Sequence, residues 1–385
     1  MKIVHFCLGC FYPDNYSYQE NLLPKFHKEL GYEVEVIAST QSFDKNGKTC
    51  FLDKTGSYQN EYDIKVTRLP YKKNNSTGHK LKQYIGTYSA IESAAPDILF
   101  IHGAQFMDIS EVVKYLKKHK NVKVYVDNHA DFSNSATNKT SKFLHKTLWR
   151  YYEQKINPYT EKFYGVLPAR VDFLVNMYKL PKEKCELLVM GADDDLVEEA
   201  AHPEVKKKLR KQYNIAEDDF LIVTGGKIDQ WKTQTLLLME AVKNIQSDKV
   251  KLIVFGSVTQ ELMDKVTALA DGKKVQYIGW IQSKDSYKYF AAADLVVFPG
   301  RHSVFWEQVA AQGIPMLCKE WNGTKHVNIG GNVRFLTQDS TEEIQNAIQT
   351  LIDNPDEYNK MKEVAVREGM KTFSYRDIAK RAIEQ

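Results

Sequence analysis

The stretch "DFLIVTGGKIDQWKTQTLLLMEAVKNI" (residues 219–245) decides the fold that the sequence predicts. It opens with an apolar run that fits a buried strand and continues through a loop with two glycines. It ends in a helical pattern of apolar residues over 233–245. Strand, glycine loop and helix in this order are typical of a parallel sheet wrapped by helices, so an α/β fold is the first expectation.

The same alternation of strands and helices recurs along the chain. Strand patterns lie at 2–8, 33–39, 96–103 and 122–129 in the first half, and at 251–257, 275–280 and 294–300 in the second. The segment 189–214 is rich in charges and has no strand pattern, so we place the hinge near residue 195. Two such halves predict two Rossmann-like domains facing across a cleft, with ligands outside the carboxyl ends of the strands.

Length and composition fit a globular protein of two domains. The chain has 385 residues, which is long for one hydrophobic core, and 43% of them are apolar. No apolar run reaches the roughly 18 residues that a membrane-spanning helix needs, and the first residues read as a strand rather than a signal peptide. Five cysteines in such a chain point to a reducing cytosol. Cys7 and Cys10 have redox-motif spacing, but packing is favoured over thiol chemistry or metal binding.

The small positive charge of the chain is confined to its first half. Residues 1–195 hold 27 Lys and Arg against 23 Asp and Glu, so the remainder holds 53 − 27 = 26 basic and 49 − 23 = 26 acidic residues. Lysines cluster at 71–82 and 114–123. Solvated lysine faces are the simpler interpretation, and the alternative is contact with anionic lipid headgroups or an acidic acceptor.

A glutamate stands inside an otherwise apolar helical stretch, "PGRHSVFWEQVAAQGIPML" (299–317). Ser303 is a suitable N-cap and Gly313 a suitable end, which predicts a helix over 304–312. Its N-terminus would follow a strand end, where free N–H groups and the helix dipole bind anions. Glu307, one turn in, is placed to accept hydrogen bonds from two ribose hydroxyls. Phosphate and ribose together describe a nucleotide diphosphate, and a packing helix with a dipole-favoured glutamate is the alternative.

The loop that follows the first strand of the second half contains two glycines and two lysines. Gly225 and Gly226 allow the backbone to approach a ligand closely, while Lys227 and Lys232 lie across the loop from each other. Two cations there can flank a diphosphate through charge-assisted hydrogen bonds of roughly 1.5–3 kcal/mol each. In company with Glu307, the lysines favour a nucleotide-diphosphate site over an ordinary strand-end loop.

Taken in order, these motifs resemble those of family 4 glycosyltransferases with the GT-B fold. The opening "MKIVHF…FYPDN…ENLLPKFHKELGYEVEVIAS" is similar to the family's first strand, loop and helix, and "PDILFIHG" (96–103) to a later strand. "VLPARVDFLVNMYKLPKEKCELLVMGADDDLV" is similar to its crossover segment, and "GGKIDQWK" to its phosphate loop. "VQYIGWIQSKDSYKYFAAADLVVFPG" and "WEQVAAQGIPML" are similar to the segment with its E-x7-E motif. "FSYRDIAKRAIEQ" (373–385) resembles its last helix, which crosses back onto the first domain, so the resemblance covers nearly the whole chain.

The resemblance implies a retaining enzyme that uses a nucleotide-sugar donor. Lys227 and Lys232 would then be catalytic and stabilise the departing nucleotide diphosphate, with Lys227 in place of the usual arginine. Glu307 matches the second glutamate of E-x7-E and would hold the ribose. The first glutamate, which contacts the transferred sugar, has no counterpart, because Pro299 stands at its position.

The loop before the glutamate helix supplies the remaining donor-side candidates. Arg301 or His302 is the candidate to replace the missing glutamate at the donor sugar. The backbone N–H groups around Ser303 and Val304 are expected to bind phosphate.

In the first half, "DNHAD" (127–131) follows a strand at its carboxyl end. By resemblance, His129 approaches the donor sugar and is counted with the catalytic residues. Asp127 and Asp131 would shape the pocket or the acceptor side, and Tyr16 stands near the place where the family has two glycines. A structural role or a metal cluster remains the alternative for this histidine between carboxylates.

These expectations define a GT-B protein with domains at 1–195 and 196–370 and a C-terminal helix at 371–385 that packs on the first domain. The expected partners are a UDP- or GDP-sugar donor, a glycan or lipid-linked acceptor and an anionic membrane surface, but no nucleic acid. No metal or other cofactor is expected, and Asp193–Asp195 read as a helix cap rather than a metal motif. The expected place is the cytoplasm or the inner face of the membrane, with bacterial surface polysaccharide synthesis as the pathway. A GT-B nucleotide-sugar epimerase and a non-catalytic nucleotide- or sugar-binding module are the alternatives.

Overall fold

The computed structural model describes residues 1–43 and 48–384, which form two compact units. The first unit comprises Met1–Val189 together with the C-terminal segment from Ile378, and the second comprises Met190–Asp377. The expected boundary at residue 195 lies just beyond this division.

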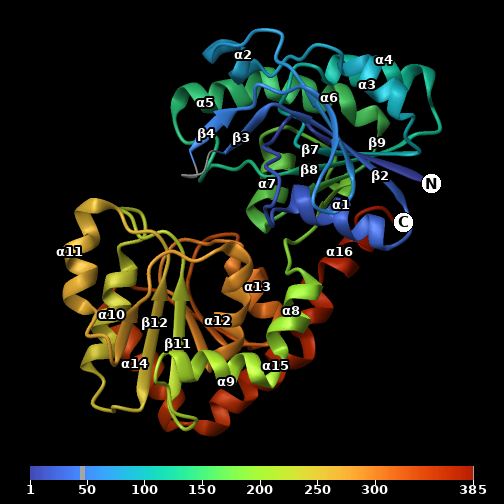
Figure 1. The fold of residues 1–385 in the computed structure, drawn as a ribbon. Coiled ribbons are helices and arrows are strands. Elements are labelled where there is room, and N and C mark those ends of the chain that lie inside the picture. Colours follow the sequence, from blue (N-terminus) through green and yellow to red (C-terminus); the bar gives the residue numbers. More distant parts are fainter. Residues whose placement is uncertain (44–47, 385) are drawn as a thin grey trace. The chain divides into compact units, whose positions relative to one another are not determined.

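A twisted sheet forms the centre of the first unit (Figure 1). Its strands lie in the order β10-β9-β8-β7-β1-β2-β6-β5, all parallel except for β5, which is antiparallel to β6. After β1 the chain forms β2, β5 and β6 on one side of it, and then crosses to form β7 to β10 on the other side. The topological switch point therefore lies between β1 and β7. The strands are β1 (Lys2–Cys7), β2 (Glu33–Ser39), β5 (Gly56–Gln59), β6 (Lys65–Leu69), β7 (Ile98–His102), β8 (Lys123–Asn128), β9 (Thr160–Gly165) and β10 (Cys185–Leu187), with a separate pair β3 (Gln41–Phe43) and β4 (Thr49–Phe51).

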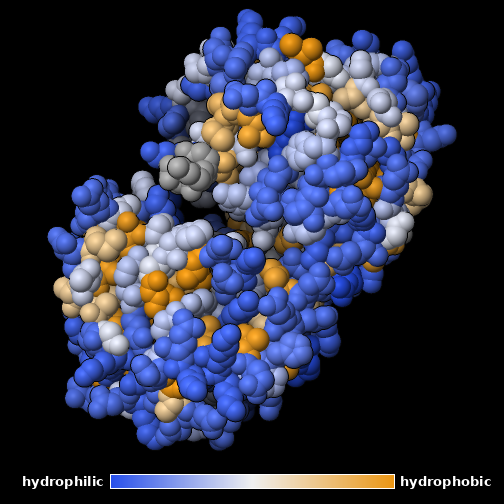
Figure 2. Space-filling model, viewed as in Figure 1, coloured by the Kyte–Doolittle hydropathy of each residue, from blue (hydrophilic) through white to orange (hydrophobic). Residues whose placement is uncertain are grey.

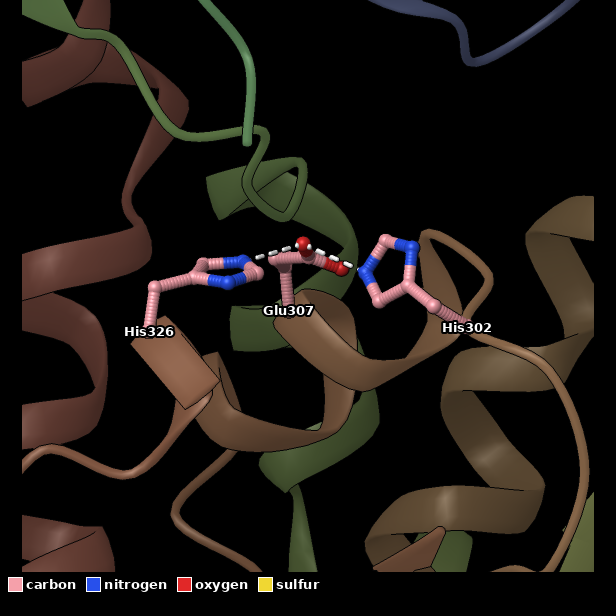
Figure 3. Close-up of side chains that lie close together, drawn as sticks. All are labelled: His302, Glu307 and His326. Atoms are coloured by element: carbon pink, nitrogen blue, oxygen red, sulfur yellow. Dashed lines mark hydrogen bonds and ion pairs between the residues drawn. The ribbon is translucent and has the colours of Figure 1, made fainter. Parts of the chain in front are cut away.

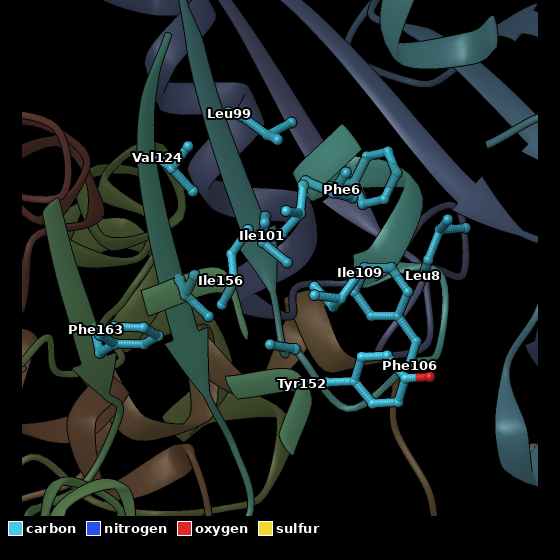
Figure 4. Packing of buried hydrophobic residues seen from close by; sticks show 14 of the residues in the cluster. Phe6, Leu8, Leu99, Ile101, Phe106, Ile109, Val124, Tyr152, Ile156 and Phe163 are labelled. Carbon is cyan, nitrogen blue, oxygen red and sulfur yellow. The ribbon is translucent and has the colours of Figure 1, made fainter. Parts of the chain in front are cut away.

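Helices cover both faces of this sheet, which explains why its central strands are buried along almost their whole length rather than at alternate residues. The helices are α1 (Gln19–Glu29), α2 (Ser76–Leu81), α3 (Thr87–Ala94), α4 (Ile109–Lys118), α5 (Lys139–Leu144), the π-helix η1 (His145–Trp149), α6 (Arg150–Ile156), α7 (Pro168–Asn176) and α16 (Tyr375–Arg381), with 3-10 turns η2 (Asn157–Tyr159) and η3 (Lys182–Lys184). Figure 4 shows the core on one face, where Phe6 and Ile101 of neighbouring strands pack toward Ile109 of α4. This packing fixes the strand ends that carry polar residues.

The second unit is built on a smaller sheet in which every strand pair is parallel. Its order is β13-β12-β11-β14-β15-β16, so the chain reverses its direction of travel between β11 and β14. Ligands in open α/β sheets bind at such a switch point, outside the carboxyl ends of the strands. The strands are β11 (Phe220–Gly225), β12 (Val250–Phe255), β13 (Val275–Tyr277), β14 (Leu295–Phe298), β15 (Met316–Lys319) and β16 (Val333–Leu336).

Helices on both faces also enclose the second sheet (Figure 1). They are α8 (Asp194–Ala201), α9 (Pro203–Gln212), α10 (Gln234–Asn244), α11 (Gln260–Leu269), α12 (Ser286–Ala292), α13 (Phe305–Ala311), α14 (Thr341–Asp353) and α15 (Pro355–Phe373), with 3-10 turns η4 (Ser283–Asp285) and η5 (Lys325–Val327). Asp193 caps α8 through a hydrogen bond from the Asp195 backbone N–H, as expected from the sequence. Helices α13 and α15 touch closely, because a Cβ on Gly369 would lie 2.0 Å from the Ala310 carbonyl oxygen.

The α/β fold and every strand expected from the sequence are confirmed. Among the described residues, no helix combines the length and the apolar character that crossing a membrane requires. Figure 2 shows hydrophilic residues over most of the face that it displays, with hydrophobic residues in separate smaller patches. The lysine clusters at 71–82 and 114–123 fall on and beside α2 and α4, where most of their lysines are exposed.

Candidate active site

Two loops meet at the switch point of the second unit, since they follow the neighbouring strands β11 and β14. Gly226 adopts a left-handed φ of +126°, and a Cβ on it would lie 3.7 Å from the Lys232 Nζ. A Cβ on Gly300, in the other loop, would lie 3.6 Å from the Lys232 Cγ. The Lys232 side chain therefore lies between the two glycine-containing loops.

Two cations at this edge lack a carboxylate partner. Burial lowers the pKa of Lys232, Asp229 raises it, and the neighbouring Arg301 lowers it further. The guanidinium of Arg301 lies over the ring of Trp231, 4.6 Å from its centroid, and 5.8 Å from that of Trp321. Throughout residues 1–43 and 48–384, neither Lys232 nor Arg301 takes part in an ion pair. Such a pair of positive charges is suited to an anionic ligand.

The second sequence-predicted lysine, Lys227, has a different environment. It is largely exposed and lies 3.5 Å from the Asp229 carboxylate, which neutralises part of its charge. Of the two lysines, Lys232 is therefore the better placed to act on a bound anion.

Glu307 lies in α13 with no exposed surface. Its Oε1 accepts hydrogen bonds from the Nε2 atoms of His302, at 2.9 Å, and His326, at 2.7 Å (Figure 3). Burial alone would raise the pKa of Glu307, but the two histidines lower it to about 2, so the group is a carboxylate. Its Oε2 has no hydrogen-bond partner among the described residues, and we call the three residues the glutamate clamp.

The glutamate clamp has the residue types of a zinc site, and its ligand atoms lie within 4.8 Å of one another. A histidine that binds a metal usually donates its other ring N–H to an acceptor. The Nδ1 of His326 is buried, and the described part of the chain offers it no such partner. The set therefore fits a hydrogen-bonded carboxylate better than a metal centre.

The start of α13 differs from the expectation. Its N-cap is Val304 rather than Ser303, because the Val304 carbonyl oxygen accepts the Gln308 N–H at 3.1 Å, and this cap makes no side-chain hydrogen bond. The Ser303 carbonyl instead accepts the Trp306 N–H. The predicted end is confirmed, since Gly313 has a φ of +70° and donates to the Ala310 carbonyl.

In the first unit, Asp127 is the second-last residue of β8 and is fully buried. Its Oδ2 accepts hydrogen bonds from the His102 Nδ1, at 2.7 Å, and the Gln19 Nε2, at 3.1 Å. The Nε2 of His129 lies 3.5 Å from the Asp127 Oδ1 and 3.9 Å from a carboxylate oxygen of Glu20. Burial would raise the pKa of Asp127, but His102 and His129 hold it far below its usual value. His129 therefore lies beside the Asp127 carboxylate.

The other two first-unit candidates have their own local partners. The Asp131 carboxylate accepts hydrogen bonds from the Ser133 N–H and hydroxyl and lies 3.3 Å from the Arg170 Nε, which fits a loop-holding role. Tyr16 packs with Tyr18, at 5.4 Å between ring centroids, and with the ring of Phe43.

Sequence reasoning missed three polar residues that the structure brings to these sites. His102 and Gln19 bind Asp127, and His326 binds Glu307. A signal existed for His102, because it ends β7, and Asp127 lies near the end of the neighbouring strand β8. None existed for His326, which lies in a short 3-10 turn far from Glu307 in sequence.

The comparisons with known proteins agree with this arrangement. Residues 205–367 match the family model described as Glycosyl transferases group 1. The chain is similar to a glycosyltransferase from Rickettsia africae ESF-5, at 15% identity over 100% of this chain and 99% of that one, with a TM-score of 0.69. It is similar in the same way to Anabaena HepE in complex with UDP, at 16% identity, with 100% and 99% coverage and a TM-score of 0.69. A UDP-GlcNAc 2-epimerase from Neisseria meningitidis gives 13% identity, 100% and 99% coverage and a TM-score of 0.64.

No curated protein matches the chain in sequence. The fold of the two units is GT-B, with a Rossmann-like sheet in each. The match to the group 1 glycosyl transferase model lies within the second unit and covers most of it.

Proposed function

We propose that the protein transfers a sugar, with retention of configuration, from a nucleoside-diphosphate donor to a glycan or lipid-linked acceptor. The observation that carries this proposal is the pair of cations Lys232 and Arg301 at the switch point of the second unit, which form no ion pair with the described residues. A diphosphate is the doubly charged group that a nucleotide-sugar presents to such a pair.

The chemistry assigned to the second unit is stabilisation of the leaving group. The bond between the sugar C1 and the diphosphate oxygen breaks while the acceptor oxygen bonds to C1 from the same face. The acceptor proton passes to the departing phosphate oxygen. Lys232 and Arg301 stabilise the charge that develops on the diphosphate, with Lys227 at its exposed side. The uncapped N–H groups around Ser303 and Val304 add donors for phosphate oxygens.

Glu307 is proposed to bind the ribose through one oxygen only. Because Oε1 is already engaged by His302 and His326, Oε2 is the atom left for a ribose hydroxyl. The sequence led us to expect that both ribose hydroxyls bind a carboxylate with two free oxygens. In the structure only Oε2 is free to accept them, and the hydrogen bonds from His302 and His326 to Oε1 fix the orientation of the carboxylate.

His129 and Asp127 are proposed to act on the sugar or acceptor side. UDP is the first nucleotide to test, because the similar Anabaena structure holds UDP. The lysines at 71–82 and 114–123 support a proposed peripheral contact with anionic lipid at the inner face of a membrane, and bacterial surface polysaccharide synthesis is the proposed pathway.

Binding calorimetry tests the donor site directly. UDP, GDP, ADP and their common sugar conjugates are titrated into the full chain, with and without Mg²⁺. We expect one nucleotide to bind without a requirement for the metal, and to bind at least about tenfold more weakly to Glu307→Ala, the loss expected for a charged hydrogen bond. Binding by none of them would refute the donor site. Turnover of UDP-GlcNAc without any acceptor into an epimeric sugar nucleotide would instead identify an epimerase.

A further inference from the structure

A row of buried histidines crosses the first unit behind Asp127. The Nε2 of His27 lies 2.8 Å from the Ala379 carbonyl oxygen, and its Nδ1 lies 2.9 Å from the Nε2 of His5. The Nδ1 of His5 lies 2.9 Å from the Nε2 of His102, whose Nδ1 lies 2.7 Å from the Asp127 Oδ2. All three rings are completely buried, and the centroids of neighbouring rings lie 5.0 Å (His5–His27) and 5.2 Å (His5–His102) apart.

The hydrogen bonds of this row need one more proton than three neutral imidazoles supply. Four hydrogen bonds run from the Ala379 carbonyl to the Asp127 carboxylate, and each bond needs one hydrogen. The terminal carbonyl oxygen is an acceptor, and so is the terminal carboxylate oxygen. Three neutral imidazoles provide three hydrogens, so the fourth must be an additional proton. With that proton, every ring nitrogen in the row has a partner and the carboxylate balances the charge.

The extra proton belongs at the end next to Asp127. Burial would lower the pKa of His102, but the Asp127 carboxylate, with Cys7 and Glu20, raises it to about 9. Burial lowers the pKa of His27 to about 4, and it lowers that of His5 well below its usual value. These two rings are therefore neutral and serve as the chain of donors and acceptors that closes the row.

We propose that His5, His27 and His102 are positioning residues that store one proton as a His102 imidazolium, which keeps Asp127 ionised and oriented toward His129. The imidazolium can exchange places with a neutral ring by proton transfer along existing hydrogen bonds, so no side chain needs to rotate. The part of this proposal that concerns His129 rests on the proposed transferase function, whereas the proton count does not.

The groups that face the row define its electrostatic setting. They are Asp127 and His129 at the end of β8, Cys7 on β1, Glu20 on α1, and the phenol of Tyr32 against the His27 ring. From α16 the Ala379 carbonyl faces the row and accepts a hydrogen bond from the His27 Nε2.

Nitrogen-15 NMR of the full chain, labelled at histidine, tests the proton count without any substrate. At pH 8 we expect one buried imidazole with both ring nitrogens protonated, and we expect its signal to disappear in His102→Asn. Only neutral imidazoles at pH 8 in the wild-type protein would overturn the proposal. His27→Asn is a matched control, because the Asn amide oxygen can still accept from the His5 Nε2 and the imidazolium should persist.

The pH profile of activity tests the positioning role. In His102→Asn the side-chain amide can still donate to Asp127, but the positive charge is gone. With UDP-glucose as the probe and UDP release as the readout, we expect the acidic limb of kcat/KM to move up by about one pH unit or more. An unmoved limb in a folded His102→Asn protein would overturn the positioning role. Absence of UDP release by the wild-type protein would count against the proposed function, and the NMR result would then decide the proton count alone.

Discussion

The glutamate clamp of the second unit leads to a sharp stability prediction. His326→Asn removes the Nε2 that donates to Glu307, because the asparagine amide reaches only the position of the imidazole Nδ1. His326→Gln is the matched variant, since its amide nitrogen can occupy the position of Nε2. The two substitutions differ by one methylene group, so they separate loss of the hydrogen bond from loss of the ring.

The expected magnitude follows from the burial of Glu307. A hydrogen bond to a charged group contributes about 1.5–3 kcal/mol, and no water replaces it at a fully buried carboxylate. Burial would raise the pKa of Glu307, but His302 and His326 lower it to about 2, so the hydrogen bond from His326 goes to a charged group. We therefore expect His326→Asn to lower the free energy of unfolding by about 2 kcal/mol.

Urea and thermal unfolding of the full chain measure this loss. For a unit of this size, about 2 kcal/mol corresponds to a fall in Tm of roughly 4–8 °C. Because the pKa of Glu307 is lowered in the folded state, this stabilisation is present above pH 4.5 and is lost as the pH falls toward 2. The difference between wild type and His326→Asn should therefore shrink in acid.

Two results would refute the reasoning. The first is a His326→Asn protein as stable as the wild type at pH 7. The second is an equal loss in His326→Asn and His326→Gln, which would show that ring packing matters rather than the bond to Glu307. A double-mutant cycle with Glu307→Gln provides the coupling between the two side chains, for which we expect about 1 kcal/mol or more.

Further predictions concern the diphosphate site and the packing of α13. Lys232→Ala should lower the rate of UDP release from UDP-glucose by about 100-fold or more, the size of effect seen when one transition-state charge stabiliser is lost. Lys227→Ala, at an exposed and partly neutralised position, should lower it less, and equal losses would contradict the roles assigned to the two lysines. Gly369→Ala should destabilise the protein by about 1–3 kcal/mol in urea unfolding, because its Cβ would lie 2.0 Å from the Ala310 carbonyl oxygen. Unchanged stability would mean that α13 and α15 can separate without cost.

Much of the architecture could be read from the sequence because it depends on local pattern. Buried parallel strands are short apolar runs, and each one ends where glycines and polar residues begin, so their positions are visible without any tertiary information. The sequence also indicates one edge of each sheet as the candidate site, since polar residues lie at the end of β8, around Asp127, and in the loop after β11. The residue types near the second-unit loop, Lys232 and Arg301 among them, were likewise recognisable from the loop's composition and order.

The tertiary structure decided how those residues are partnered. The sequence presents Glu307 as a carboxylate with two free oxygens, but folding brings His326 from another segment to occupy one of them. The sequence treats Lys227 and Lys232 alike, yet Asp229 pairs with one and Arg301 lies beside the other. The buried row from His27 to Asp127 joins four separate segments, and no spacing along the chain announces it. Hydrogen bonds and charge interactions act over a few ångströms in space, so only the packed chain determines which groups meet and which proton each one keeps.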